Sequence, residues 1–132
     1  MSYVGIVGAG TMGRGIAQVF IQSGWQVILS DPISKQLTSA TKQIKKGLTR
    51  DVEKGRLNSG KKDIILKNIR AVTSLLPLAD VDLVIEAVTE KLDLKLEIFS
   101  QMGKICGKKT VFASNTSSIS ITQLGVAAGF PS

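Results

Sequence analysis

Three glycines near the start of the chain have the spacing of a loop that binds a diphosphate. They lie in a stretch that matches the pattern G-x-G-x-x-G, Gly8-Ala9-Gly10-Thr11-Met12-Gly13. In such a loop the first glycine permits a tight turn, the second lets the backbone approach the diphosphate, and the third lets helix and strand pack closely. Amides at the start of the helix then bind the anion. The alternative is a plain strand-turn-helix corner whose glycines serve geometry alone.

One carboxylate follows the loop at the distance where a dinucleotide site needs an acceptor for ribose hydroxyls. Asp31 ends a short apolar run and precedes Pro32. As a ribose ligand it would disfavour a 2′-phosphate, because unit charges ~4 Å apart at an effective dielectric of ~20 repel by roughly 4 kcal/mol. Its alternative role is the N-cap of the next helix. The ribose interpretation predicts NAD rather than NADP, and the loop by itself also allows FAD.

Residue types that are absent or rare exclude several kinds of catalytic site within the chain. Its 132 residues include no histidine, so Ser-His-Asp and Cys-His catalysis and histidine-bound metals are excluded. Cys106 is the only cysteine, which leaves no internal disulfide and too few thiols for a zinc cluster, and we expect no metal. No apolar run reaches the ~18 residues of a membrane span and no signal peptide is visible. These features favour the cytoplasm.

Short apolar strands alternate with helical patterns, which is typical of a parallel sheet covered on both faces. The expected strands cover residues 3–7, 26–30, 69–73, 82–88 and 110–114. Helices are expected from Thr11, over 33–67 with an interruption near Gly55–Gly60, from 92 to about Gly107, and from Ser120. The chain, residues 1–132, is therefore expected to form one α/β domain of the Rossmann type, a doubly wound parallel sheet. A helical hairpin is inserted between its second and third strands.

The first helix is expected to have one apolar face, because its apolar residues recur at i, i+4, i+7 and i+8: Met12, Ile16, Val19 and Phe20. Gly24 should end this helix as a left-handed cap. Pro32 suits the first turn of the following helix, so the change from strand to helix is expected at Asp31-Pro32.

The positive charge of the chain is concentrated in the inserted hairpin. The net charge is +7, and the segment 35–70 carries eleven lysines and arginines against three acids, a net charge of +8. Such a segment is most often a solvated face, and nucleic-acid binding is the further alternative. Its helices lack aromatic residues for stacking, and the sequence has no recognised nucleic-acid motif. We therefore expect neither a nucleic-acid nor a membrane partner.

Several blocks together resemble the NAD-binding domain of 3-hydroxyacyl-CoA dehydrogenases, including 3-hydroxybutyryl-CoA dehydrogenases. The matching stretches occur in family order and are Gly5–Gln18, Asp82–Val88, Lys95–Phe99 and the more specific Ala113-Ser114-Asn115-Thr116-Ser117-Ser118. The likeness covers essentially the whole chain, the inserted hairpin included. It implies hydride transfer between a 3-hydroxyacyl-CoA and NAD, in fatty acid metabolism or a related route.

The resemblance also assigns roles to single residues. Glu90 and Lys95 match residues near the nicotinamide half of the cofactor, and Ser117 matches the serine that hydrogen-bonds the reacting oxygen, with Asn115 in the same turn. Lys54 falls on a lysine that contacts coenzyme A. The plainer alternatives are a cap for Ser117, a dipole-compensating acid for Glu90 and a solvated lysine for Lys95. Gly47 departs from the family, because some relatives have a serine there at the coenzyme A.

The end of the sequence also departs from the family pattern. A His-Phe-Phe-Asn-Pro block with the general-base histidine should follow, and the chain ends at Phe130-Pro131-Ser132. The resemblance thus implies a cofactor-binding fragment that is nearly inactive without its C-terminal helical domain, from a parent enzyme that is a homo-oligomer, such as a dimer. The alternatives are a domain of the 3-hydroxyisobutyrate and 6-phosphogluconate dehydrogenase type and a non-catalytic NAD-binding protein.

Overall fold

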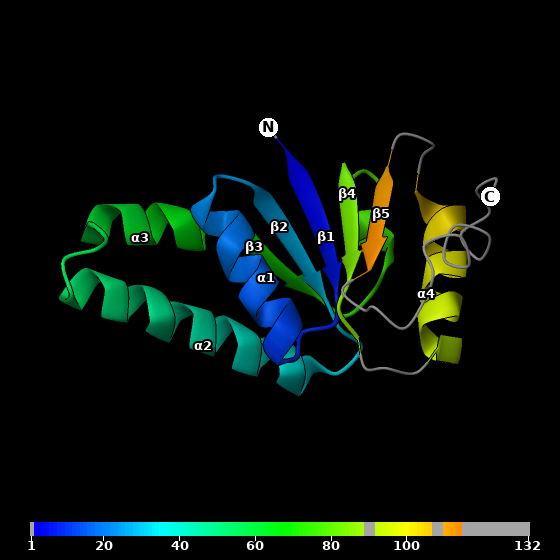
Figure 1. Cartoon of the computed structure of the whole chain (residues 1–132), viewed down its shortest axis with the longest axis horizontal. Helices are drawn as coiled ribbons and strands as arrows, with labels where there is room; N and C mark the ends of the chain where they lie inside the picture. The colour runs from blue at the N-terminus through cyan, green and yellow to red at the C-terminus, as the bar shows by residue number, and fades with distance from the viewer. Residues whose placement is uncertain (1, 89–91, 107–109, 115–132) are drawn as a thin grey trace.

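The chain folds into alternating strands and helices around one sheet (Figure 1). The computed structural model describes residues 2–88, 92–106 and 110–114, and for 92–95, 99 and 112–114 it describes the backbone alone. The elements in chain order are β1 (Tyr3–Val7), α1 (Thr11–Gln22), β2 (Gln26–Ser30), α2 (Ser34–Glu53), α3 (Ser59–Leu66), β3 (Ile69–Val72), the 3₁₀ turn η1 (Leu76–Leu78), β4 (Leu83–Glu86), α4 (Leu92–Ile105) and β5 (Val111–Ser114). The helix expected from Ser120 lies outside the described residues.

The five strands form a parallel sheet in the order β3-β2-β1-β4-β5. Val4 of β1 pairs with Val27 of β2 on one side and with Leu83 of β4 on the other. This order is that of a Rossmann fold, and it confirms the expected doubly wound sheet. The chain changes direction across the sheet at β1, so the carboxyl ends of β1, β2 and β4 border the crevice where such sheets bind ligands.

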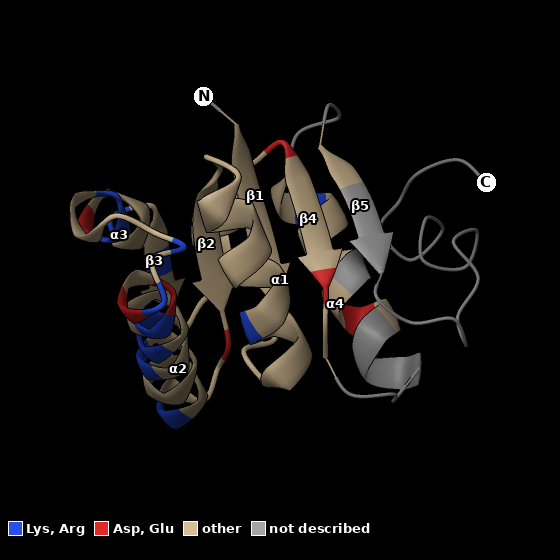
Figure 2. Ribbon diagram, turned by 60° about the vertical axis from the view of Figure 1, so that its left-hand side comes forward, with Lys and Arg blue, Asp and Glu red and all other residues tan. Residues whose placement is uncertain are grey.

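Two hydrophobic clusters cover the two faces of the sheet, because alternate residues of β1 point in opposite directions. Val4 and Ile6 belong to the cluster under α1 and α2, whereas Val7 belongs to the cluster with η1 and α4. A Cβ added at Gly5 would lie 2.6 Å from two side-chain atoms of Leu78, so η1 packs directly on the strand. The views in Figures 1 and 2 show α1 and α4 on opposite faces.

The face that α1 presents to the core agrees only in part with the one expected from its apolar residues, because Ile16 and Phe20 are partly buried against the cluster. Met12 and Val19 are 55% and 62% exposed, and the buried stripe consists of Gly13, Ala17 and Ile21. The expectation was wrong for Met12 and Val19 because α1 turns Gly13 and Ala17 toward the core, and a Cβ at Gly13 would lie 1.7 Å from the Gly8 carbonyl oxygen. The expected cap is confirmed: Gly24 has φ +91° and follows the C-cap Ser23.

Helices α2 and α3 occupy the chain between β2 and β3, and they pack against each other. Leu37, Ile44 and Leu48 of α2 are buried in the cluster that also holds residues of α1, β1 and β2. The Lys62 ammonium donates to the Thr49 hydroxyl at 3.2 Å between α2 and α3. The α2–α3 turn projects away from the sheet (Figure 1), and basic residues line both helices (Figure 2). Helix α2 begins at Ser34, so Pro32 precedes the helix rather than standing in its first turn.

Candidate functional site

The glycine loop makes a tight turn between β1 and α1, held against the ends of two neighbouring strands. Gly8 has φ +107°, a conformation that side chains rarely adopt, and its amide donates to the Ser30 carbonyl at 2.8 Å. A Cβ added at Gly8 would also lie 2.9 Å from the carbonyl group of Ala87, just beyond β4. The turn therefore lies at the crevice between β1, β2 and β4.

The other two glycines differ sharply in the space around them. A Cβ at Gly13 would lie 1.7 Å from the Gly8 carbonyl oxygen, so this glycine permits the contact between helix and loop. A Cβ at Gly10 would meet nothing within 4 Å. Gly10 is the N-cap of α1 and has no side chain to cap the first amides of the helix. The loop thus leaves open space in front of a helix N-terminus, which suits a close-fitting anion such as a diphosphate.

Asp31 holds the loop and the start of the next connection together. Its Oδ2 accepts a hydrogen bond from the Ala9 amide and its Oδ1 accepts one from the Ile33 amide, each at 2.9 Å. The N-cap of α2 is Ile33, so the alternative role of Asp31 as N-cap does not hold. Two carboxylate oxygens offer about four acceptor positions, so two remain for a ligand. These two positions could accept hydrogen bonds from the two hydroxyls of a ribose that is next to a diphosphate on this loop.

A cavity of about 490 Å³ opens beside Asp31, between the ends of β1 and β2, the segment after β3, and α4. Its walls are mostly apolar and include Leu75, Leu76, Val88, Ile98 and Ile105. The buried Ser30 joins two parts of the cavity wall, because its hydroxyl donates to the Ser74 carbonyl at 2.9 Å. A cavity of this size and character, next to a diphosphate loop, suits a flat heteroaromatic ring.

Glu86 is fully buried at the carboxyl end of β4, and its Oε2 accepts from the Val88 amide at 2.6 Å. The side chain thereby fixes the segment that carries Val88 into the cavity wall. Cys106, at the end of α4, donates its thiol to the Leu78 carbonyl at 3.3 Å. Burial raises the pKa of this thiol, the Thr110 hydroxyl lowers it, and the charge of Asp80 raises it further.

Of the predicted site residues that the structure describes, the glycine loop and Asp31 lie together, and Lys54 lies apart from them. The glycine loop, residues 8–13, and Asp31 share one edge of the sheet, whereas Lys54 caps α2 at the tip of the hairpin and is exposed. Lys95 lies on α4, but its side chain is outside the described part, as are Glu90, Asn115 and Ser117 entirely.

Sequence reasoning missed the side chains that α4 brings to the cavity, Glu97 and Gln101. These two polar residues stand one helical turn apart, next to Ile98 and Met102, which anchor the helix in the core. The spacing of Glu97 and Gln101 is visible in the sequence, but the face of α4 that meets the crevice depends on how η1 packs.

Within the residues that the structure describes, no group of three or more Cys, Asp and Glu side chains is placed to hold a metal. None of the described helices combines the length and hydropathy that a membrane span requires.

Comparison with known proteins gives consistent results. The sequence model of the family described as 3-hydroxyacyl-CoA dehydrogenase, NAD binding domain, matches residues 3–132. A probable 3-hydroxybutyryl-CoA dehydrogenase of Deinococcus radiodurans is 42% identical over 127 residues, which are 96% of this chain and 45% of that protein. The 3-hydroxyadipyl-CoA dehydrogenase of Escherichia coli is 41% identical over 121 residues, 92% of this chain and 26% of that protein.

Solved structures show the same likeness. The crystal structure of (S)-3-hydroxybutyryl-CoA dehydrogenase from Ralstonia eutropha superposes with a TM-score of 0.91 at 41% identity, over 96% of this chain and 45% of that one. This chain therefore spans less than half the length of these similar proteins.

Proposed function

This chain belongs to the family of NAD-binding domains of 3-hydroxyacyl-CoA dehydrogenases, and from that premise we propose how its residues hold NAD, the cofactor of the family. The amides at the N-terminus of α1, where Gly10 leaves open space, would hold the diphosphate. Asp31 would accept hydrogen bonds from the hydroxyls of the adenosine ribose, and the cavity lined by Leu75, Val88 and Ile98 would take the adenine ring. The cofactor, when bound, supplies a nicotinamide ring that accepts or gives a hydride.

The remaining roles in this proposal are supported by the resemblance of single residues to the family. Glu90 and Lys95 approach the nicotinamide half, while Ser117, with Asn115 in the same turn, hydrogen-bonds the oxygen of the reacting 3-hydroxyacyl group. Lys54 contacts coenzyme A. In the whole protein the hydride passes between a 3-hydroxyacyl-CoA and NAD in the cytoplasm, and a C-terminal helical domain completes the acyl site and the dimer. The 132 residues alone bind the cofactor with little turnover, because a missing general base typically costs ~10²–10⁴-fold.

The open space at Gly10 is the observation that supports this placement of the diphosphate. A Cβ there touches nothing in the free protein, and the φ of −73° at Gly10 is one that alanine readily adopts. Gly10→Ala should therefore leave the fold intact and place a methyl group where the diphosphate must approach. Gly15→Ala is the matched control, because a Cβ at Gly15 on α1 also touches nothing within 4 Å.

The experiment is a titration of NADH onto the chain and both variants, followed by cofactor fluorescence, with melting temperatures measured in parallel. We expect Gly10→Ala to weaken NADH binding by at least about tenfold, or 1.4 kcal/mol, without lowering the melting temperature. Gly15→Ala should bind NADH like the parent chain. Equal NADH affinity in all three proteins would mean that the diphosphate does not lie on this loop.

A further inference from the structure

We propose that Glu97 is a second specificity-determining residue, which acts with Asp31 to exclude a 2′-phosphate and so selects NAD over NADP. This inference rests on the proposed placement of the adenosine in the cavity, and it adds a residue on α4 to a selection otherwise assigned to the end of β2.

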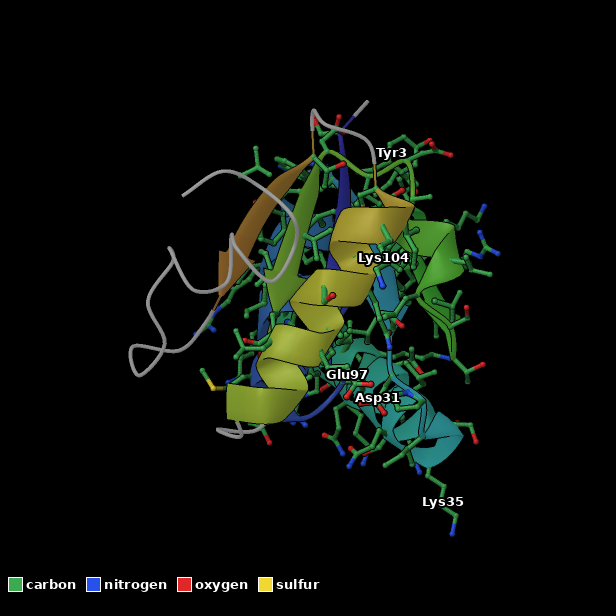
Figure 3. All side chains as sticks on the ribbon, turned by 90° about the vertical axis from the view of Figure 1, so that its right-hand side faces the viewer. Tyr3, Asp31, Lys35, Glu97 and Lys104 are labelled. Carbon is green, nitrogen blue, oxygen red and sulfur yellow. The ribbon has the colours of Figure 1, made fainter. Side chains whose placement is uncertain are left out.

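Asp31 and Glu97 line the same cavity from two elements far apart in the sequence. In Figure 3, which looks across α4 toward the sheet, the labels of the two side chains lie close together near the lower end of α4, and both residues line the one cavity. Two carboxylates thus border the space that the adenosine would occupy. A ribose bound by Asp31 would carry any 2′-phosphate into the field of both.

The described lining of this cavity contains no lysine or arginine to offset these two charges. Lys35, at the start of α2, extends away from the cavity into solvent (Figure 3), and Lys104 on α4 is not among the lining residues. Sites that accept NADP place an arginine near the 2′-phosphate. The charged side chains in the described lining are therefore both acidic, although the whole chain carries a net charge of +7.

The position of Glu97 on α4 is fixed by its neighbours. Ile98 and Met102 are buried in the core, and the Gln101 amide lies 3.5 Å from Glu97 Oε1, at the limit of a hydrogen bond. Glu97 itself is exposed, so it acts through charge across solvent rather than as a tightly held ligand. Its effect must then be modest and sensitive to salt, which separates it from the direct contact assigned to Asp31.

The test compares the dissociation constants of NADH and NADPH for the chain, Glu97→Gln and Glu53→Gln, at low ionic strength and in 0.5 M NaCl (a concentration on the order of that needed to screen exposed charges). Glu97→Gln removes the charge and keeps the size of the side chain. Glu53→Gln changes the net charge equally but lies at the end of α2, outside the cavity lining. The same pair is repeated with Asp31→Asn, where NADPH binding is strong enough to measure accurately.

At low salt we expect Glu97→Gln to tighten NADPH binding by about three- to tenfold, with NADH changed less than about twofold. High salt should remove most of this gain, and Glu53→Gln should show none. An unchanged NADH/NADPH ratio in Glu97→Gln, while the parent chain binds NADH, would overturn the role of Glu97 alone. Failure of the parent chain to bind NADH would overturn the proposed function and this inference with it.

Discussion

The carboxylate of Asp31 accepts a hydrogen bond from the amide of Ala9, inside the glycine loop, at 2.9 Å. The group assigned to the ribose thus also holds the backbone that is assigned to the diphosphate. A second bond, from the Ile33 amide, fixes the same carboxylate from the other side. The loop and the ribose acceptor therefore form one preorganised unit, and binding the cofactor requires little rearrangement of either.

Asp31→Ala should weaken NADH binding by about tenfold, because hydrogen bonds to a charged group contribute about 1.5–3 kcal/mol. It should weaken NADPH binding much less, since the same change removes a repulsion from the 2′-phosphate. The ratio of the two dissociation constants is the quantity to measure, because loosening of the loop affects both cofactors alike. An unchanged ratio would show that Asp31 does not contact the ribose.

Gly13→Ala should destabilise the fold itself. The added Cβ would lie 1.7 Å from the Gly8 carbonyl oxygen, which is backbone and cannot turn away. We expect a loss of about 3 kcal/mol in the free energy of unfolding and a melting temperature lower by roughly 10 °C. Gly15→Ala, with no neighbour within 4 Å, should instead gain about 0.5–1 kcal/mol of helix propensity. Equal stability of the two variants would contradict the close packing of α1 on the loop.

The sequence predicted the strands, their parallel arrangement and the glycine loop because each depends on local patterns. Apolar runs predicted β1, β2 and β4, and the three spaced glycines predicted the turn between β1 and α1. The burial of α1 was misjudged for a physical reason. Gly13 lies against the Gly8 carbonyl oxygen and Ala17 is fully buried, and a prediction based on large apolar residues overlooks such small ones.

The cavity could not be predicted, because it is assembled from segments distant in the chain. Its walls combine the end of β2, residues 73–76, Val88 and one face of α4. Which side chains of α4 point there depends on how Leu78 and Met102 pack in the core. Similarly, the contact of Asp31 with the Ala9 amide could not be predicted, because the two residues are 22 positions apart in the chain.

Glu86→Ala should be among the more destabilising changes of a single polar residue. The carboxylate is fully buried, and truncation leaves both a cavity and a partly buried Val88 amide without this acceptor. We expect a loss of about 2–4 kcal/mol in urea unfolding. Glu53→Ala, on the exposed side of α2, should change stability by less than about 0.5 kcal/mol. A similar small effect at both positions would mean that the buried carboxylate contributes little net stability.

Cys106 should react slowly with iodoacetamide at neutral pH, because burial raises the pKa of its thiol and only the thiolate attacks. The rate should still be rising above pH 9, whereas the thiol of the urea-unfolded chain should approach its plateau earlier. The folded state favours the neutral thiol, so its contribution to stability is complete below the unfolded pKa and is lost as pH rises through the folded pKa. A plateau at the same pH in both states would contradict this environment.

Lys54→Ala should weaken coenzyme A binding by about threefold at low salt, the effect expected of one exposed charge on an anion. The residue caps α2 at the tip of the hairpin through its backbone, whose amide donates to the Arg50 carbonyl, so removal of the side chain leaves that bond intact. Lys35→Ala, at the opposite end of α2, removes the same charge and should have little effect.

Dephospho-coenzyme A, which lacks the 3′-phosphate, shows which group of the ligand Lys54 attracts. If Lys54 contacts the 3′-phosphate, the two variants should bind dephospho-coenzyme A equally. Equal losses for both variants with intact coenzyme A would mean that the basic surface attracts the ligand only through its overall charge.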